Sequence, residues 1–152
     1  MSEVLIRPIR EADYAAWLPL WLGYNAFYGR AWETALPEVI TARTWARFFD
    51  PEEPVFALVA ELDGVVVGLT HYLYHRSTIS IANNCYLQDL FTAEAARGKG
   101  VATALIEGVY RVAAEAGAAR VYWLTHETNV TAQRVYDRVA ERSGFIVYRH
   151  ML

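Results

Sequence analysis

Residues 97–103 read Arg-Gly-Lys-Gly-Val-Ala-Thr, and they stand between an apolar, strand-like run and an amphipathic helix. Small side chains at positions 98, 100 and 102 allow the backbone to approach a ligand closely. The unpaired N–H groups at the start of the helix then point at that ligand, and the helix dipole favours an anion. A pyrophosphate group suits such a site, although an ordinary glycine-rich turn has the same composition and needs no ligand.

Two other phosphate-binding motifs do not match this stretch. The dinucleotide fingerprint requires a third glycine where Thr103 stands. The nucleotide P-loop ends in Gly-Lys-Ser/Thr, whereas Lys99 is followed by Gly100. The stretch therefore belongs to neither of these nucleotide-binding classes.

Apolar runs upstream of the stretch predict four strands and two helices. An Asp-Gly pair at residues 63–64 joins two β-rich runs, which is a strong hairpin signal. Asp13 can cap the first helix, and Pro37 opens the second. The predicted strands cover residues 4–9, 55–62, 65–81 and 85–92.

Downstream, apolar residues recur at steps of three and four, which indicates amphipathic helices. Leu105 and Val109 mark the first of these helices, and Val135 and Val139 mark the second. A strand of six residues is predicted between them, beginning at Arg120. The last eight residues, 145–152, are apolar enough to predict a closing strand.

The predicted order is β-α-α-β-β-β-α-β-α-β. This order indicates an α/β fold with a mixed, mostly antiparallel central sheet and helices on both faces. The strand–helix–strand unit around the quoted stretch makes a parallel crossover, which is right-handed in nearly all proteins. A chain of 152 residues with 55% hydrophobic and 20% charged residues fits one folded domain, residues 1–152.

Composition narrows the function class. A net charge of -3 disfavours binding to the phosphates of nucleic acid. Cys85 is the sole cysteine, so no intrachain disulfide can form. We expect the Cys85 side chain to be buried and to pack as a small hydrophobic group. No signal-peptide core or membrane-length apolar run is found, so we expect a cytoplasmic protein without membrane contact. His71 and His75 share a strand face but lack a third ligand, so no metal site is predicted.

Three segments together resemble the GNAT N-acetyltransferase superfamily. Residues 97–102 match its Gln/Arg-x-x-Gly-x-Gly/Ala signature. The preceding Tyr-Leu-Gln-Asp-Leu-Phe-Thr at 86–92 is similar to the fourth strand of the family. Asn129-x-x-Ala132-x-x-x-Tyr136 is similar to the later family segment. Residues 122–129 resemble the Hpa-type subgroup, which is similar to the spermidine/spermine acetyltransferases.

This resemblance implies acetyl-CoA as co-substrate. The main chain of residues 97–103 would hold the pyrophosphate, and a β-bulge around residues 90–92 would separate the fourth and fifth strands to admit the pantetheine arm. Asn129 would bond that arm, although a plain helix N-cap is an equal alternative. The implied cofactor-binding residues are Leu90, Phe91, Thr92, Arg97, Gly98, Lys99, Gly100, Val101, Ala102, Thr103, Asn129 and Tyr136.

The same resemblance assigns two catalytic groups. The backbone N–H of Leu90 would polarise the thioester carbonyl as a one-donor oxyanion hole. Tyr136 would be the general acid that protonates the departing thiolate, whereas its alternative role is that of a core aromatic beside the apolar stripe of its helix.

The general base is left open by the sequence. An amine with a pKa near ~10.4 costs roughly 4–5 kcal/mol to deprotonate at neutral pH. Polyamine acetyltransferases carry a glutamate where this chain has Gln88, which cannot act as a base and which puts a polyamine acceptor in doubt. Asp89 acting through water, Glu33, Glu127 and solvent are the alternatives.

The predicted reaction moves an acetyl group to the primary amine of a small molecule by direct attack in a ternary complex. Acetylation of a protein lysine or N-terminus is the second reading, and a non-catalytic acyl-CoA-binding module is the third. An edge strand so near the chain end also predicts a homodimer. The implied acceptor-side residues are Tyr24, Phe27, Tyr28, Gln88 and Asp89, with Trp32 as a further aromatic wall.

Overall fold

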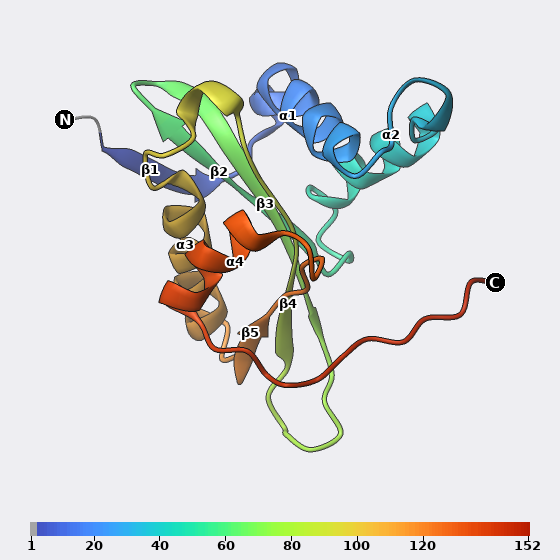
Figure 1. Cartoon of the computed structure of the whole chain (residues 1–152), viewed down its shortest axis with the longest axis vertical. Helices are drawn as coiled ribbons and strands as arrows, with labels where there is room; N and C mark the ends of the chain where they lie inside the picture. Colours follow the sequence, from blue (N-terminus) through green and yellow to red (C-terminus); the bar gives the residue numbers. More distant parts are fainter. Residues whose placement is uncertain (1–2) are drawn as a thin grey trace.

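The computed structural model describes residues 3–152, and it contains a five-stranded sheet in the order β1-β2-β3-β4-β5 (Figure 1). The first four strands are antiparallel to their neighbours, and β5 runs parallel to β4. The strands are β1 Val4–Pro8, β2 Val55–Leu62, β3 Val65–His75, β4 Asn84–Thr92 and β5 Arg120–Tyr122. The predicted α/β class with a mixed sheet is confirmed.

Four α-helices cover the two faces of the sheet. Helices α1 and α2 lie on one face, and α3 with α4 lies on the other (Figure 1). The helices are α1 Tyr14–Phe27, α2 Glu38–Arg47, α3 Val101–Glu115 and α4 Val130–Val139, with short 3₁₀ turns at Glu11–Asp13, Trp32–Thr34 and Glu94–Ala96. Within residues 3–152, no helix combines the length and the apolar character that crossing a bilayer would need.

The Asp-Gly pair forms the predicted hairpin between β2 and β3. Asp63 has φ +53° and Gly64 has φ +78°, the two left-handed conformations of a type I′ turn. Leu62 therefore pairs directly with Val65. This turn fixes the pairing of β2 with β3 next to the loop.

Asp13 precedes α1, as the sequence predicts, but its carboxylate does not cap that helix. It accepts two hydrogen bonds from the Arg7 guanidinium at 2.8 Å and one from the Arg10 backbone N–H at 2.7 Å. The charged partner from β1 thus outcompetes the helix N–H groups for this carboxylate. Hydrogen bonding to Arg7 and Arg10 holds the pKa of Asp13 below its usual value despite burial.

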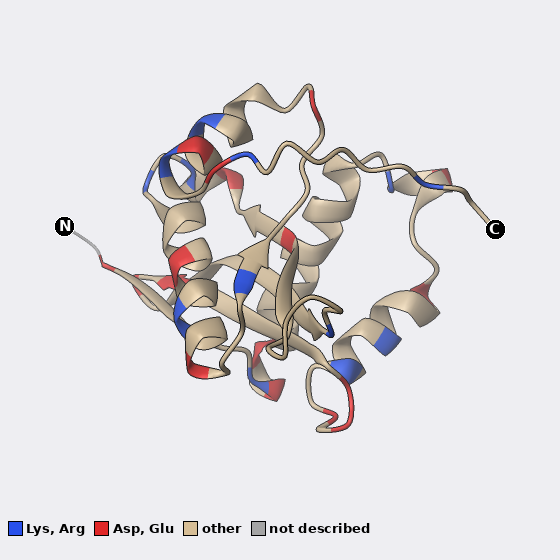
Figure 2. Ribbon diagram, turned by 90° about the horizontal axis from the view of Figure 1, so that it is seen from below, with Lys and Arg blue, Asp and Glu red and all other residues tan. Residues whose placement is uncertain are grey.

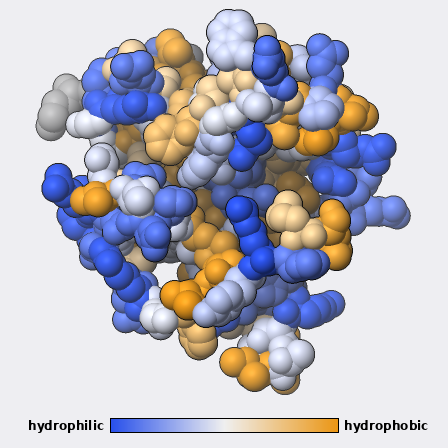
Figure 3. Space-filling view, turned by 45° about the vertical axis from the view of Figure 1, so that its right-hand side comes forward, coloured by the Kyte–Doolittle hydropathy of each residue, from blue (hydrophilic) through white to orange (hydrophobic). Residues whose placement is uncertain are grey.

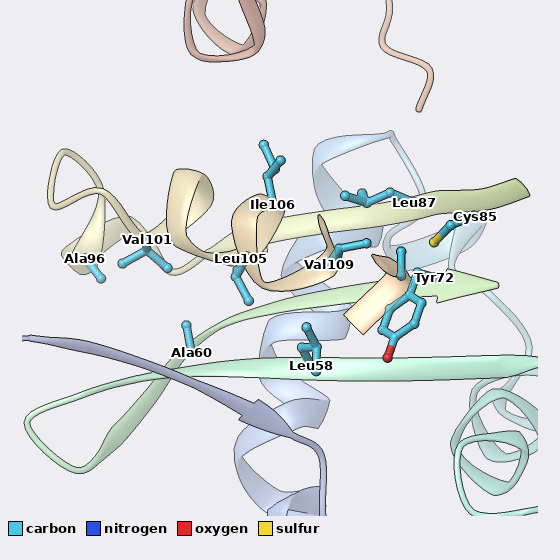
Figure 4. Close-up of a cluster of buried hydrophobic side chains, with 11 residues drawn as sticks. Leu58, Ala60, Tyr72, Cys85, Leu87, Ala96, Val101, Leu105, Ile106 and Val109 are labelled. Atoms are coloured by element: carbon cyan, nitrogen blue, oxygen red, sulfur yellow. The ribbon is translucent and has the colours of Figure 1, made fainter. Parts of the chain in front are cut away.

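The α3 face of the sheet is packed with small and aliphatic residues. Leu105 and Val109 of α3 lie over Leu58 and Ala60 of β2 (Figure 4). Gly68 of β3 lets the first turn of α3 come close, since a Cβ there would lie 2.8 Å from Val101 Cγ1. The buried, unpaired Cys85 belongs to the same cluster, as expected.

A β-bulge in β4 changes which face its side chains reach. Leu87 pairs with Tyr72 and Asp89 pairs with His71, so Gln88 is an extra residue without a partner in β3. Leu87 packs in the α3 cluster, whereas Asp89, two residues later, bonds His71 on the α1 face. In a regular strand these two residues would share a face, so the bulge exchanges the faces of odd- and even-numbered residues in the rest of β4. The bulge lies upstream of the predicted position at residues 90–92.

The predicted closing strand is wrong. Residues 140–152 follow α4 as an extended, exposed segment that runs away from the sheet (Figures 1 and 2). Two other strands end early, β3 at His75 and β5 at Tyr122. Because β5 has only three residues, its free edge offers few hydrogen bonds to a closing strand, and apolar composition alone does not form one.

Candidate active site

The strands β4 and β5 separate after a short parallel ladder. Pairing is limited to Asn84–Tyr86 of β4 and Arg120–Tyr122 of β5. Beyond that point, residues 87–92 pair with β3 alone. Alternate residues of this stretch direct backbone N–H and C=O groups toward the gap, because an antiparallel strand bonds one neighbour with every second residue. The separation that the sequence predicts is therefore present.

A small pocket occupies this gap and draws on four elements. Helix α1 contributes two tyrosines, β4 contributes residues on both sides of its bulge, and the segment after β5 and helix α4 close the opposite wall. The lining residues are Tyr24, Tyr28, Leu87, Gln88, Leu90, Trp123, Leu124 and Tyr136. Segments more than one hundred residues apart in the chain thus meet at one cavity.

Tyr136 joins this pocket from α4. Its ring packs edge-on against Trp123 with the ring centroids 5.4 Å apart, and it also touches the aliphatic cluster under α3. Burial raises the pKa of the Tyr136 phenol to about 12, and neighbouring Tyr28 adds to this effect. The phenol is therefore protonated at physiological pH, as a proton donor must be. Both sequence readings of Tyr136 describe its position.

The loop before α3 has the backbone shape that its glycines allow. Gly98 and Gly100 both have φ +78°, and a Cβ on either would meet nothing within 4 Å. Gly100 is the N-cap of α3 and offers no side-chain acceptor, so the first N–H groups of the helix lack intrahelical partners. Open space and free donors at a helix N-terminus fit a pyrophosphate.

Arg97 of this loop is directed back toward β4. Its Nε donates to the Thr92 carbonyl oxygen at 3.4 Å, and its guanidinium carbon lies 5.8 Å from the centroid of the Phe91 ring. Lys99 is exposed. The main chain of the loop is thus its principal donor to an anion. The Thr92 carbonyl is already engaged within the protein, although the sequence predicts it as a pantetheine contact.

Asn129 caps α4, as one of its two sequence readings states. Its Oδ1 accepts a hydrogen bond from the Ala132 backbone N–H at 3.3 Å. The side-chain amide nitrogen carries the remaining donors, which is the part of the residue that can bond a ligand carbonyl. The two readings of Asn129 are therefore compatible.

Asp89 lies under α1 in a buried polar cluster. Its Oδ2 accepts from His71 Nδ1 at 2.9 Å, and His71 Nε2 accepts from Trp17 Nε1 at 3.0 Å. All three side chains are buried. Burial raises the pKa of Tyr24, and the nearby Asp89 carboxylate raises it further.

Several predicted acceptor-side groups lie away from the pocket. Phe27 packs edge-on against Tyr28 and is 62% exposed, and Trp32 is 95% exposed. The two alternative bases Glu33 and Glu127 are exposed as well, and neither lines the pocket. Phe27 and Trp32 therefore do not form the aromatic wall of the pocket that the sequence predicts, because both side chains are exposed to solvent at and beyond the end of α1.

The acetyltransferase (GNAT) family model matches residues 17–140, which include every element of this site. The D-amino-acid N-acetyltransferase of Saccharomyces cerevisiae is 34% identical over 150 residues, covering 97% of this chain and 91% of that protein. The chain belongs to the acetyltransferase (GNAT) family. An uncharacterized N-acetyltransferase of Bacillus subtilis is 30% identical over 145 residues, covering 94% of each chain.

A solved structure supports the GNAT fold. An aminoglycoside N-acetyltransferase in complex with coenzyme A superposes with a TM-score of 0.81 at 18% identity, covering 99% of this chain and 96% of that chain. That identity is informative about the fold alone. The family match and the named relatives make this GNAT protein an N-acetyltransferase enzyme.

Sequence reasoning missed one residue of this GNAT site. His71 was expected on an ordinary strand face, yet it is buried and bonded to Asp89 and Trp17. Only the register of β3 against β4 reveals that contact. His75, four residues later, bonds Tyr122 instead. Among residues 3–152 no group of three metal-ligating side chains is found.

Proposed function

We propose that the enzyme uses acetyl-CoA to acetylate the primary amine of a small molecule by direct attack in a ternary complex. The observation that carries this proposal is the gap between β4 and β5, where Leu90, Gln88 and Tyr136 line one pocket. A thioester entering through that gap would bring its carbonyl to the exposed backbone of β4. The acceptor would then approach from the α1 side.

Binding of acetyl-CoA would rest on backbone donors. The N–H groups of residues 98–103 would hold the pyrophosphate at the N-terminus of α3. The free edge of β4, from Leu90 onward, would bond the pantetheine arm in the manner of an added strand. The amide nitrogen of Asn129 would reach the same arm from the start of α4.

Two groups of this chain would act on the thioester. The N–H of Leu90 would donate to the carbonyl oxygen as negative charge develops on it. The Tyr136 hydroxyl would give its proton to the sulfur as the C–S bond breaks. With a pKa of about 12 against roughly 8.5 for a thiol, this transfer is uphill by about 4–5 kcal/mol. It is therefore expected to occur in concert with bond cleavage.

Asp89 is the candidate for holding and deprotonating the acceptor. Gln88 lines the pocket but has no basic atom, whereas Asp89 carries a carboxylate one residue further on, linked to the pocket through Tyr24. Its carboxylate would attract the ammonium form and pass the released proton to water. Glu33 and Glu127 are poorer candidates, since neither lines the pocket.

A small acceptor is favoured over a protein amine by the small size of the pocket, whose lining includes Tyr24 and Tyr28. Among similar proteins, one is named for D-amino acids and others for aminoglycosides, all of which are small amines. Acetylation of protein lysines or N-termini would require a more open groove. A non-catalytic acyl-CoA-binding role would leave the tyrosine and carboxylate of the site without a purpose.

The test is an acetyl-CoA turnover assay against a panel of D- and L-amino acids, diamines, aminoglycosides and lysine peptides. Turnover of one or more small primary amines, with ordered or random ternary-complex kinetics, is the expected result. Parallel double-reciprocal lines would point to a covalent acetyl-enzyme and contradict direct attack. Turnover confined to peptides would contradict the small-molecule assignment.

A homodimer is part of the same proposal. The C-terminal segment exposes Phe145, Ile146, Val147 and Tyr148, which are all at least 64% accessible. Figure 3 shows hydrophobic side chains exposed at several separate places on one face of the molecule. Beside β5 lies a cavity of about 350 Å³ whose lining includes small apolar residues such as Ala113, Ala118 and Val121. A second copy's C-terminal segment would cover that cavity and extend the free edge of β5.

Light scattering at micromolar concentration tests the dimer. The parent chain should have twice the monomer mass, and the double variant Phe145→Ser, Val147→Ser should be monomeric. The matched control is Ile79→Ser, Ile81→Ser, which removes two equally exposed apolar residues from the loop after β3. A monomeric parent chain would refute the proposal.

A further inference from the structure

Within residues 3–152, Asp89 is a buried carboxylate that pairs with no lysine or arginine. Asp89 is 8% exposed to solvent. Among residues 3–152, the one basic side chain within ion-pair distance of it is His71. An isolated buried charge is costly unless it is paired, so the protonation state of His71 decides whether Asp89 is neutralised.

The Trp17 indole fixes that protonation state. An indole N–H is a donor only, and Trp17 Nε1 lies 3.0 Å from His71 Nε2. Nε2 must therefore be the unprotonated, accepting nitrogen. The single imidazole proton lies on Nδ1 and is donated to Asp89 Oδ2 at 2.9 Å. His71 is thus neutral and orients Asp89 without cancelling its charge.

The neighbours of His71 keep it in this state. Trp17 and Trp21 of α1 and Phe48 of α2 pack around its ring, with centroids 4.7–6.0 Å away. None of these three side chains titrates. Among residues 3–152, Asp89 of β4 is the one charged group bonded to the imidazole, and the pKa of Tyr24, the other titratable group nearby, is raised by burial and by Asp89.

We propose that Trp17 and His71 are positioning residues that keep Asp89 as an unpaired carboxylate, ready for the ammonium group of the acceptor. The inference rests on the proposed function and adds the chemical class of the acceptor: a primary amine that arrives protonated, rather than a neutral aromatic amine or an alcohol. Tyr24 lines the pocket, and so do Gln88 and Leu90, the residues on either side of Asp89, so the carboxylate belongs to the stretch of β4 that borders the pocket.

The tautomer can be measured without any acceptor. Protein labelled with ¹⁵N in its histidines, examined by long-range ¹H–¹⁵N spectra, distinguishes the Nδ1–H form, the Nε2–H form and the imidazolium. We expect His71 to show the neutral Nδ1–H form at about pH 7 to 8, as its bonds to Trp17 and Asp89 require. An imidazolium or an Nε2–H form at pH 7 would overturn the proposal.

The recognition of ammonium is tested on the same sample. Ethylammonium chloride should shift the Nδ1 signal of His71, whereas ethanol, its neutral counterpart of similar size, should not. The signals of His75, which bonds Tyr122, serve as the internal control. Equal responses to both probes would overturn the ammonium assignment, and because no turnover is involved, this result is independent of the reaction itself.

The kinetics of Trp17→Phe test the pH dependence of KM for the amine, which a purely structural role of Trp17 would leave unchanged. Without the indole donor, His71 Nε2 can bind a proton, and the imidazolium then competes with the acceptor for Asp89. The KM for the amine should rise at least about tenfold between pH 8 and pH 6 relative to the parent, as expected for loss of a charged hydrogen bond. A KM profile parallel to the parent would contradict the proposal.

Two further variants separate positioning from folding. His71→Asn retains a donor near Nδ1 and should keep KM for the amine within a few-fold of the parent, whereas His71→Leu should raise it about ten- to hundredfold. Affinity for CoA should be unchanged in both. His75→Asn, on the same strand, is the matched control and should change none of these values. Equal KM values for the Asn and Leu variants would overturn the role of His71.

Discussion

The two faces of the sheet are built from different kinds of residue. Under α3 the core is aliphatic and includes glycine and alanine, so that the helix lies close to the strands. Under α1 and α2 the core consists largely of aromatic rings in tilted, edge-on and stacked contact around a buried polar cluster, and Trp17 is fully buried. The packing under α3 therefore fixes the distance between the backbones of the helix and the strands, whereas the packing under α1 and α2 fixes the orientation of polar side chains.

This difference follows from what each face would bind. A pyrophosphate and a pantetheine arm are recognised by N–H and C=O groups, so the α3 face needs a helix start fixed at a short distance from β4. An ammonium group is recognised by a carboxylate, so the α1 face needs Asp89 fixed in orientation. Rigid aromatic rings and neutral donors accomplish that without adding a competing charge.

The largest effect is expected where the two faces meet, at Tyr136. Tyr136→Phe keeps the ring and its contact with Trp123 but removes the hydroxyl, so kcat should fall by about 10²–10⁴ while CoA affinity and thermal stability stay near those of the parent. Steady-state kinetics and calorimetry measure the three quantities. Turnover within a few-fold of the parent, with chemistry rate-limiting, would leave Tyr136 as a core aromatic.

The next largest effect should break the α3 face alone. Gly100→Val places a branched side chain at φ +78° in the loop that would hold the pyrophosphate, so the dissociation constant for CoA should rise at least about tenfold. Its matched control is Gly117→Val, at φ +76° beyond the other end of α3, which carries the same backbone strain far from the loop. Equal CoA affinity in the two variants would contradict the pyrophosphate site.

A pair of alanine substitutions compares how tightly the two faces are packed. A Cβ on Gly68 would lie 2.8 Å from Val101 Cγ1 and 3.2 Å from the Phe91 backbone oxygen, so Gly68→Ala should destabilise the protein by about 1–3 kcal/mol. A Cβ on Gly23 meets only the tip of the Phe91 ring, and alanine favours the helix by about 1 kcal/mol. Urea unfolding of the two variants should therefore separate them, and equal losses would show that the faces are equally tight.

The smallest effect concerns the pH dependence of the proton donor. Because burial raises the pKa of Tyr136 to about 12, the neutral phenol persists well above the ordinary tyrosine value. The kcat at saturating acceptor should fall less than about twofold between pH ~7.5 and pH ~10.5, whereas a pKa of ~10 would give a fall of about fourfold. A phenol with its ordinary pKa would lose activity toward the upper end of that range, and such a loss, absent from the stability profile, would contradict the assignment.

Local signals were sufficient for much of this fold. The Asp63-Gly64 turn and the stripe on α3 are decided by residues within a few positions of one another, and both were predicted. The bulge at Gln88 depends on the pairing of β4 with β3, and the bond between Trp17 and His71 joins residues 54 apart in the chain. The closing strand failed for a related reason, since a strand needs a partner as well as an apolar composition.

The unpaired Gln88 also makes the two halves of β4 separable for protein engineering. Odd-numbered residues before it, such as Cys85 and Leu87, support α3, whereas odd-numbered residues after it, Asp89 and Phe91, face α1. Acceptor preference can therefore be redesigned on the later positions without loosening the helix that begins at the glycine loop. Deleting Gln88 would remove the bulge and make Asp89 the direct neighbour of Leu87, and because neighbouring residues of a regular strand point to opposite faces, both side chains would keep the faces that they have now.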